Sequence, residues 1–184
     1  MTRYQALTIY AALIIATGFV LILLAYYPVR AIQYIVAACM LLSAGFAFLT
    51  AYKSENMQIQ LNYHYLHGIG MLTYGLAILF WAYTIENFFG ITIFFLLYYA
   101  MAEMIFCFQL LMMRQKYIDD KIIIYRLLIG FFIALGAVFV LATAYSDQNK
   151  ALLAVGAVFV FSGVYLILFK TVLKRADQPV VIEQ

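Results

Sequence analysis

Long apolar runs separated by short polar links extend from one end of the chain to the other. A membrane-spanning helix needs about 20 predominantly apolar residues at a rise of about 1.5 Å each. Runs of this length lie at residues 5–27, 29–52, 63–84, 88–113, 122–145 and 151–173. The pattern predicts an all-α, polytopic membrane protein with six transmembrane helices in a single integral membrane domain, 1–184.

The links between these runs alternate in length. The links at residue 28, residues 85–87 and residues 146–150 are very short, whereas those at 53–62 and 114–121 are longer and more charged. Because short links hold neighbouring helices antiparallel, we expect three helical hairpins. Residues 176–184 then form a short tail, in which nothing encodes a partner.

Composition excludes several classes of protein. The chain is 68% hydrophobic and 10% charged, whereas soluble domains carry about 25% charged residues. A water-soluble enzyme, a nucleic-acid-binding module and a disordered chain are therefore excluded. Phosphate-binding loops, nucleophile elbows and basic-aromatic stripes are absent from the sequence, so we predict no catalytic residues and no nucleic-acid partner. The lipid bilayer is the expected partner.

The distribution of positive charge predicts how the chain is oriented. Short cytoplasmic loops retain Lys and Arg, and translocated loops lose them. One side has only Arg30 and Lys150, and the other has nine basic residues: Arg3, Lys53, Arg114, Lys116, Lys121, Arg126, Lys170, Lys174 and Arg175. We therefore predict that both termini face the cytoplasm. The first run is longer than a signal-peptide core and no small-x-small cleavage site follows it, so we interpret it as a retained helix.

Small residues recur at matching places in the three hairpins. Gly18, Gly75 and Gly136 align in the first helices, and Gly45, Ala102 and Gly163 take one common place in the second helices. Small residues at helix crossings let backbones approach closely in lipid. We therefore predict that these six positions are packing sites, and that residues 5–53, 62–114 and 121–174 form three parallel repeats.

This pattern resembles the HdeD-like acid-resistance membrane proteins of bacteria. The resemblance covers nearly the whole chain and rests on three helix pairs: ALIIATGFVLILLAYYP with MLLSAGFAFLTAYK, GIGMLTYGLAILFWAY with LLYYAMAEMIFCF, and LLIGFFIALGAVFVLATAY with VFVFSGVYLILFK. It implies a multi-pass protein of the bacterial inner membrane that is associated with stress or acid tolerance. The family offers no catalytic motif to transfer to this chain.

Glu103 is the most informative single residue. A carboxylate near the centre of a membrane helix costs roughly 2.5 to 3.5 kcal/mol and is normally partnered or functional. Tyr99 lies four residues before it on the same face. Folding residues 63–84 against 88–113 about their turn brings His67 to a similar depth, so His67 is the predicted partner.

Two interpretations of this candidate site remain open. In the functional interpretation, Glu103 and His67 form a proton-accepting pair whose protonation changes helix packing. In the structural interpretation, Glu103 is neutral or forms a hydrogen bond with Tyr74 or a backbone carbonyl.

The remaining candidate groups predict no cofactor. His64 and His67 share a helix face, but two histidines are too few for a typical metal site, and CxxCH is absent. Helix depth places Cys39 and Cys107 too far apart for a disulfide. Arg126 lies near a helix end, where we expect its side chain to reach the lipid headgroups, as we do for Lys170, Lys174 and Arg175.

Three function classes remain. We favour a non-catalytic, stress-related membrane protein that acts through its own bundle, as a homo-oligomer or with other membrane proteins. The alternatives are a small proton-linked carrier or channel that uses Glu103, and an embedded accessory subunit of a larger membrane complex.

Overall fold

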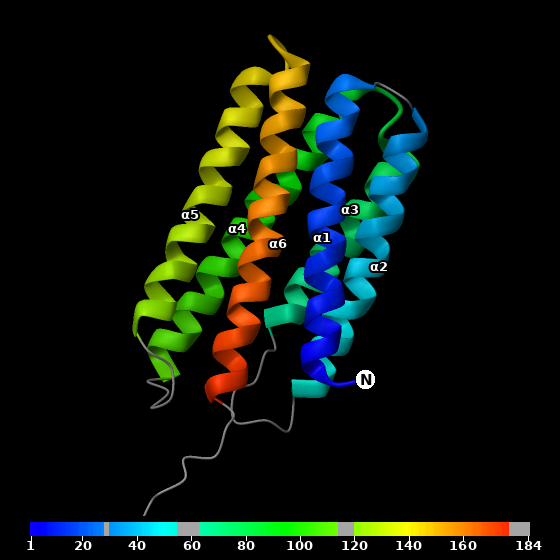
Figure 1. Cartoon of the computed structure of the whole chain (residues 1–184). Coiled ribbons are helices and arrows are strands. Elements are labelled where there is room, and N and C mark those ends of the chain that lie inside the picture. Colours follow the sequence, from blue (N-terminus) through cyan, green and yellow to red (C-terminus); the bar gives the residue numbers. More distant parts are fainter. Residues whose placement is uncertain (28–29, 55–62, 114–119, 177–184) are drawn as a thin grey trace, which may run out of the picture.

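The computed structural model describes residues 1–27, 30–54, 63–113 and 120–176, which form six helices and contain no strand. The helices are α1 (Arg3–Tyr26), α2 (Arg30–Ser54), α3 (Tyr63–Trp81), α4 (Ile85–Met113), α5 (Asp120–Thr143) and α6 (Gln148–Ala176). They run alternately up and down in one bundle, so the start of α1 and the end of α6 lie at the same end (Figure 1). The predicted tail lies almost wholly outside the described residues.

Polar residues at the helix starts explain several of the observed boundaries. Thr2 and Gln5 form a reciprocal capping box at α1, with hydrogen bonds of 2.8 and 3.3 Å. The Thr84 hydroxyl accepts a hydrogen bond from the Asn87 amide at the start of α4. Asp147 accepts one from the Lys150 amide at the start of α6, and a further hydrogen bond from the Lys150 side chain lowers the pKa of Asp147. Each cap satisfies a backbone donor that the helix leaves free.

Five of the six helices are long and apolar enough to cross a membrane, which indicates a membrane protein. The exception is α3, which has 19 residues and begins with Tyr63, His64, Tyr65, Leu66 and His67. The tyrosine and histidine rings in this segment lower the hydropathy of the first turns of α3. All six predicted helices are present and five of them fit the prediction of a transmembrane span, whereas α3 is less apolar and shorter than the predicted run 63–84.

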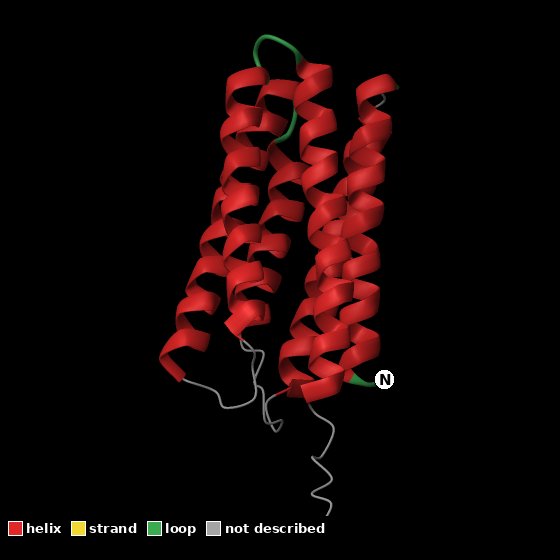
Figure 2. Ribbon diagram, turned by 60° about the vertical axis from the view of Figure 1, so that its left-hand side comes forward, coloured by secondary structure: helices red, strands yellow, loops and turns green. Residues whose placement is uncertain are grey.

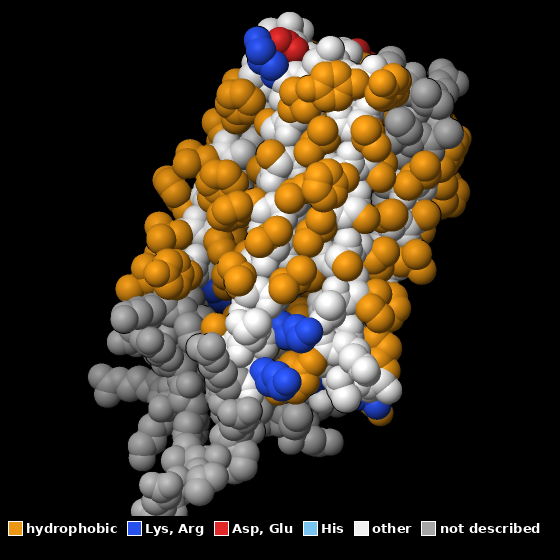
Figure 3. Space-filling view, in the orientation of Figure 1, with side chains coloured by type: hydrophobic (Ala, Val, Ile, Leu, Met, Phe, Trp, Pro, Cys, Tyr) orange, Lys and Arg blue, Asp and Glu red, His pale blue; other side chains and the backbone are white. Residues whose placement is uncertain are grey.

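The helices form a closed ring, in which each packs against the next and α6 packs against α1. The contact of α1 with α6 is the most extensive, and those of α3 with α4 and of α5 with α6 are the least. Figure 2 shows the bundle from another side, with helices along its full length. Figure 3 shows hydrophobic side chains over the middle of one face and most of the visible Lys and Arg toward the end that carries the N-terminus.

Glycines make the crossing of α1 and α6 unusually close. A Cβ atom at Gly18 would lie 2.6 Å from the Gly156 carbonyl oxygen, and one at Gly163 would lie 2.8 Å from the Ala11 carbonyl oxygen. Such distances leave no room for a side chain, because the obstructing atoms belong to the backbone. Gly18 and Gly163 therefore lie at a packing site, as the sequence predicts.

The other predicted packing positions differ from one another. A Cβ at Gly75 would meet Leu41 of α2 at 2.9 Å, a Cβ at Gly136 would meet Val158 of α6 at 2.6 Å, and Ala102 is buried. Gly45 is a correction to the prediction, because a Cβ there would meet nothing within 4 Å. Its alignment with Gly163 reflects position along the helix but not the direction in which the residue faces.

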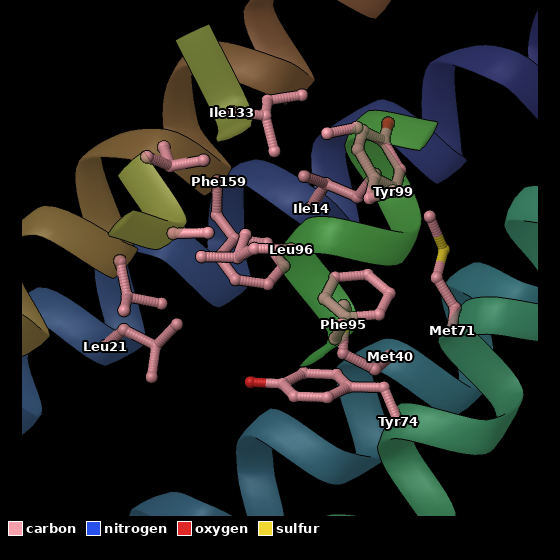
Figure 4. Packing of buried hydrophobic residues seen from close by; sticks show 14 of the residues in the cluster. Ile14, Leu21, Met40, Met71, Tyr74, Phe95, Leu96, Tyr99, Ile133 and Phe159 are labelled. Atoms are coloured by element: carbon pink, nitrogen blue, oxygen red, sulfur yellow. The ribbon is translucent and has the colours of Figure 1, made fainter. Parts of the chain in front are cut away.

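Aromatic and aliphatic side chains fill the centre of the ring. The ring of Phe95 lies 4.4 Å from that of Tyr74 and 5.7 Å from that of Phe159, which joins α4 to α3 and α6. Figure 4 shows these side chains with Leu96 and Ile14 between the helices. The cavity at this level holds about 10 Å³, too little for more than one water molecule.

Candidate functional site

Glu103 and His67 lie side by side inside the bundle. His67 Nε2 of α3 is 3.5 Å from Glu103 Oε1 of α4, and the two side chains are 0% and 1% exposed. This separation is slightly longer than a normal hydrogen bond. The two groups are therefore in contact, and protonation of the imidazole would make the contact an ion pair.

Arg126 is the second partner of Glu103, and its position corrects the sequence prediction. Its Nη1 lies 3.3 Å from Glu103 Oε2, and the side chain is 0% exposed. The sequence predicts that this side chain reaches the headgroups, whereas in the structure it points from α5 into the bundle. An ionised carboxylate and a guanidinium compensate each other there, since an unpaired buried charge is costly.

Aromatic rings enclose the guanidinium of Arg126. Its Cζ atom lies 3.9 Å from the ring centroid of Phe169, 4.4 Å from that of Phe106 and 4.5 Å from that of Tyr63. Ring faces attract cations, and more strongly when water is excluded. The rings come from α6, α4 and α3, so one cation on α5 holds three other helices around it.

Two tyrosine hydroxyls extend the series of contacts formed by His67, Glu103 and Arg126, one at each end. Arg126 Nη2 donates a hydrogen bond to the Tyr63 hydroxyl, and the Tyr10 hydroxyl lies 3.2 Å from His67 Nδ1. Tyr10, His67, Glu103, Arg126 and Tyr63, which we call the buried polar cluster, thus form a continuous series of polar contacts. It draws residues from α1, α3, α4 and α5.

The two predicted tyrosines lie in different places. The ring of Tyr99 stacks on His67 with 4.3 Å between the centroids, so it belongs to the wall of the buried polar cluster. The Tyr74 hydroxyl lies 2.9 Å from Thr92 Oγ1, away from Glu103. The predicted alternative of a hydrogen bond between Tyr74 and Glu103 is therefore not found.

His64 is buried beside the buried polar cluster without joining it. Neither ring nitrogen has a hydrogen-bond partner among the described residues, and its ring lies 4.0 Å from that of Tyr63. Within the ranges that the structure covers, no three His, Cys, Asp or Glu side chains converge as metal ligands. Cys39 and Cys107 are both free thiols.

The arrangement is suited to holding a proton away from water. A carboxylate and an imidazole can each accept a proton, and Arg126 supplies a fixed positive charge beside them. Protonating Glu103 would remove the negative charge that faces both Arg126 and His67. Since the guanidinium would then be buried without a counter-charge, the helices around it would have to repack.

Depth matching in the sequence places Arg126 near the level of Glu103, although it does not say which way the side chain points. Matching depths across the link between α4 and α5 places Glu103 level with position 130, and a Cβ atom added at Gly130 would indeed lie 3.4 Å from Glu103 Cβ. Arg126 lies one helical turn from Gly130 and so within reach of the carboxylate. The same depth matching across the link between α3 and α4 indicates His67.

Comparisons with known proteins leave the family open. No protein-family description, curated protein or solved structure matches this chain.

Proposed function

We propose that this chain is a non-catalytic, multi-pass protein of the bacterial inner membrane, associated with stress or acid tolerance, whose buried polar cluster makes its helix packing depend on protonation. All six helices cross the membrane as three parallel hairpins, and both termini are cytoplasmic. The protein acts through its own bundle, as a homo-oligomer or with other membrane proteins.

The observation that carries the proposal is the contact of one buried carboxylate with both a fixed cation and an imidazole. In lipid, ionisable residues are expensive and normally mark a functional position. A carboxylate paired with arginine alone would suit a purely structural role. The additional imidazole introduces a second group that can bind a proton beside the carboxylate.

The groups that face Glu103 all lie within the ring of helices. They are Tyr10 from α1, Tyr63 and His67 from α3, Tyr99 and Cys107 from α4, Arg126 from α5 and Tyr165 from α6, and His64 lies behind them, next to His67. Glu103 is the only carboxylate among these described residues, and His67 is the imidazole in contact with it, at 3.5 Å. These two residues are therefore the proposed proton acceptors.

The closed site supports a packing response over transport. Glu103 lines none of the three described cavities, and its side chain is 1% exposed. A carrier or channel needs a path from the site to one face of the membrane, whereas the Glu103 side chain is enclosed by the helices around it.

The experiment is a pH series of thermal unfolding with the purified protein in mild detergent. We expect the Tm and the tyrosine fluorescence of the wild type to change between about pH 4 and pH 7, and this change to be lost in E103Q and reduced in H67Q. Y74F is the matched control, because it removes a buried hydroxyl outside the buried polar cluster. If E103Q retains the pH profile of the wild type, the proposal is wrong.

A second variant covers the case in which E103Q does not fold. H67Q leaves the ion pair of Glu103 and Arg126 intact, so it tests the imidazole without exposing a buried charge. Wild-type protein in liposomes with an internal pH dye separates packing from transport. Proton flux that disappears in E103Q would replace our proposal with the carrier function.

A further inference from the structure

The surface between α5 and α6 is hollowed into an apolar groove of about 720 Å³. It is lined mainly by large side chains, among them Tyr125, Leu128 and Phe132 of α5 and Val164, Leu168 and Phe169 of α6. This volume lies in the range of about 300–1,000 Å³ that is typical of ligand sites. The groove lies where two neighbouring helices of the ring make least contact.

The length and position of the groove match one leaflet of a bilayer. Its lining extends from Tyr125 to Leu135 on α5 and from Phe161 to Val172 on α6, which at 1.5 Å per residue is about 15 Å. Half of the hydrocarbon thickness is also about 15 Å. The groove begins close to the end of the bundle where α5 starts and α6 finishes, and it ends near the middle of both helices.

We propose that this groove binds one acyl chain of an anionic phospholipid from the leaflet at the end of the bundle that carries the N-terminus. At that end Thr171 lines the groove, and the exposed Lys174 lies three residues further along the same helix surface. Lys170 lies one helical turn before Lys174, so two positive charges lie near this end of α6. The charge at the end of the groove is thus complementary to an anionic headgroup.

The lining favours a lipid chain over a helix of a partner or of a second copy. Helices that pack in membranes use small residues to bring their backbones together, as α1 and α6 do at Gly18 and Gly163. Apart from Thr171 at its end, the groove presents Leu, Ile, Val, Phe and Tyr side chains. A partner helix would also need a contact surface across the full membrane, and the groove covers half of that length.

The groove shares a wall with the buried polar cluster. Phe169 and Tyr165 line the groove, and their rings lie 3.9 and 5.5 Å from the Arg126 guanidinium. An acyl chain in the groove would therefore cover the rings that separate Arg126 from the lipid. The proposal itself stands on the groove and does not depend on the proposed proton response.

The experiment measures stabilisation of the delipidated protein in detergent by added lipid. A ligand that binds the folded state raises the Tm in a saturable way. We expect dioleoyl phosphatidylglycerol to do so at lower concentration than dioleoyl phosphatidylcholine. The tryptophan of L128W would fill the groove. It should raise the half-saturating concentration of phosphatidylglycerol about tenfold or more, because the acyl chain of the lipid loses apolar contact area.

A matched control is available on the same helix. Leu141 is 55% exposed, as Leu128 is, but it does not line the groove, so L141W should respond to lipid as the wild type does. L168W, on the opposite wall, repeats the test if L128W is poorly folded. K174Q should reduce the preference for phosphatidylglycerol and leave the response to phosphatidylcholine unchanged.

Three outcomes would overturn the proposal. The first is an unchanged lipid response in both L128W and L168W. The second is a change of oligomeric size in L128W with no change in its lipid response, which would assign the groove to a second copy. The third is an equal response to phosphatidylglycerol, phosphatidylcholine and oleate, which would reject the anionic phospholipid as the ligand.

Discussion

At the scale of single residues, the burial of Arg126 together with Glu103 defines the energetics of the site. Neither charge has water to solvate it, so each depends on the other. Removing one partner of such a pair typically costs about 3–5 kcal/mol, because the remaining charge stays buried and unpaired. Replacing both residues by neutral ones leaves no unpaired charge in the interior.

A double-mutant cycle follows from this dependence. We expect E103Q and R126Q each to lower the free energy of unfolding by about 3–5 kcal/mol, and the double variant E103Q/R126Q to lose less than either single variant. Reversible unfolding in mixed detergent micelles measures all four proteins. Additive losses would show that the two side chains do not interact in the folded state.

The hydroxyl of Tyr10 allows a second prediction at this scale. Tyr10 contacts His67 Nδ1, for which no other partner is described, so Y10F should cost about 1–3 kcal/mol. Thr92 donates a hydrogen bond to the Phe88 carbonyl and keeps it when Tyr74 loses its hydroxyl. Y74F should therefore cost less than Y10F in the same unfolding measurement. Equal costs would mean that the hydroxyl of Tyr10 is not needed by His67.

The residues of the site differ in how far the sequence predicts them. The pairing of Glu103 with His67 follows from helix length and one short turn, which fix the depths of both residues. The burial of Arg126 does not follow from depth alone, because a long side chain near a helix end reaches either the headgroups or the interior. The rotation of α5 about its own axis decides whether the side chain reaches the headgroups or the interior. An apolar run with little periodicity does not reveal that rotation.

At the scale of helices, the sequence predicts elements well and their contact faces poorly. The six observed helices coincide with the six apolar runs to within a few residues at most ends, because a membrane-length run has one stable backbone conformation. The glycines show the limit of this approach. Gly18 and Gly45 align equally well with glycines of other hairpins, yet only Gly18 lies at a close crossing.

This difference gives a prediction with an internal control. G18A should destabilise the protein by about 1–3 kcal/mol, because its Cβ would meet the Gly156 carbonyl at 2.6 Å and force α1 from α6. G163A should behave in the same way, since it meets Ala11 and Ile15. G45A should be neutral or stabilising, because the added methyl group meets nothing within 4 Å and alanine favours the helix. Thermal unfolding compares the three variants, and a loss in G45A as large as in G18A would contradict this account.

At the scale of the whole molecule, the proposed orientation depends on every helix crossing the membrane. By composition, α3 is the helix least suited to cross the membrane, because its first turns carry two histidines. The ring of contacts provides a physical reason for it to cross. Tyr63, His64 and His67 face inward and are buried, so the lipid does not meet the residues that lower the hydropathy of this helix.

Labelling from outside the cell tests this crossing and the orientation together. In a background without the native cysteines, K53C lies before α3 and Y83C lies after it; both positions are exposed. A membrane-impermeant maleimide should modify Y83C in intact cells and should reach K53C only after the membrane is permeabilised. N149C and K174C, at the two ends of α6, should repeat this pattern. If K53C and Y83C reacted from the same side, α3 would not cross the membrane. If only K53C and K174C were labelled in intact cells, the protein would have the opposite orientation to the one that the positive charges predict.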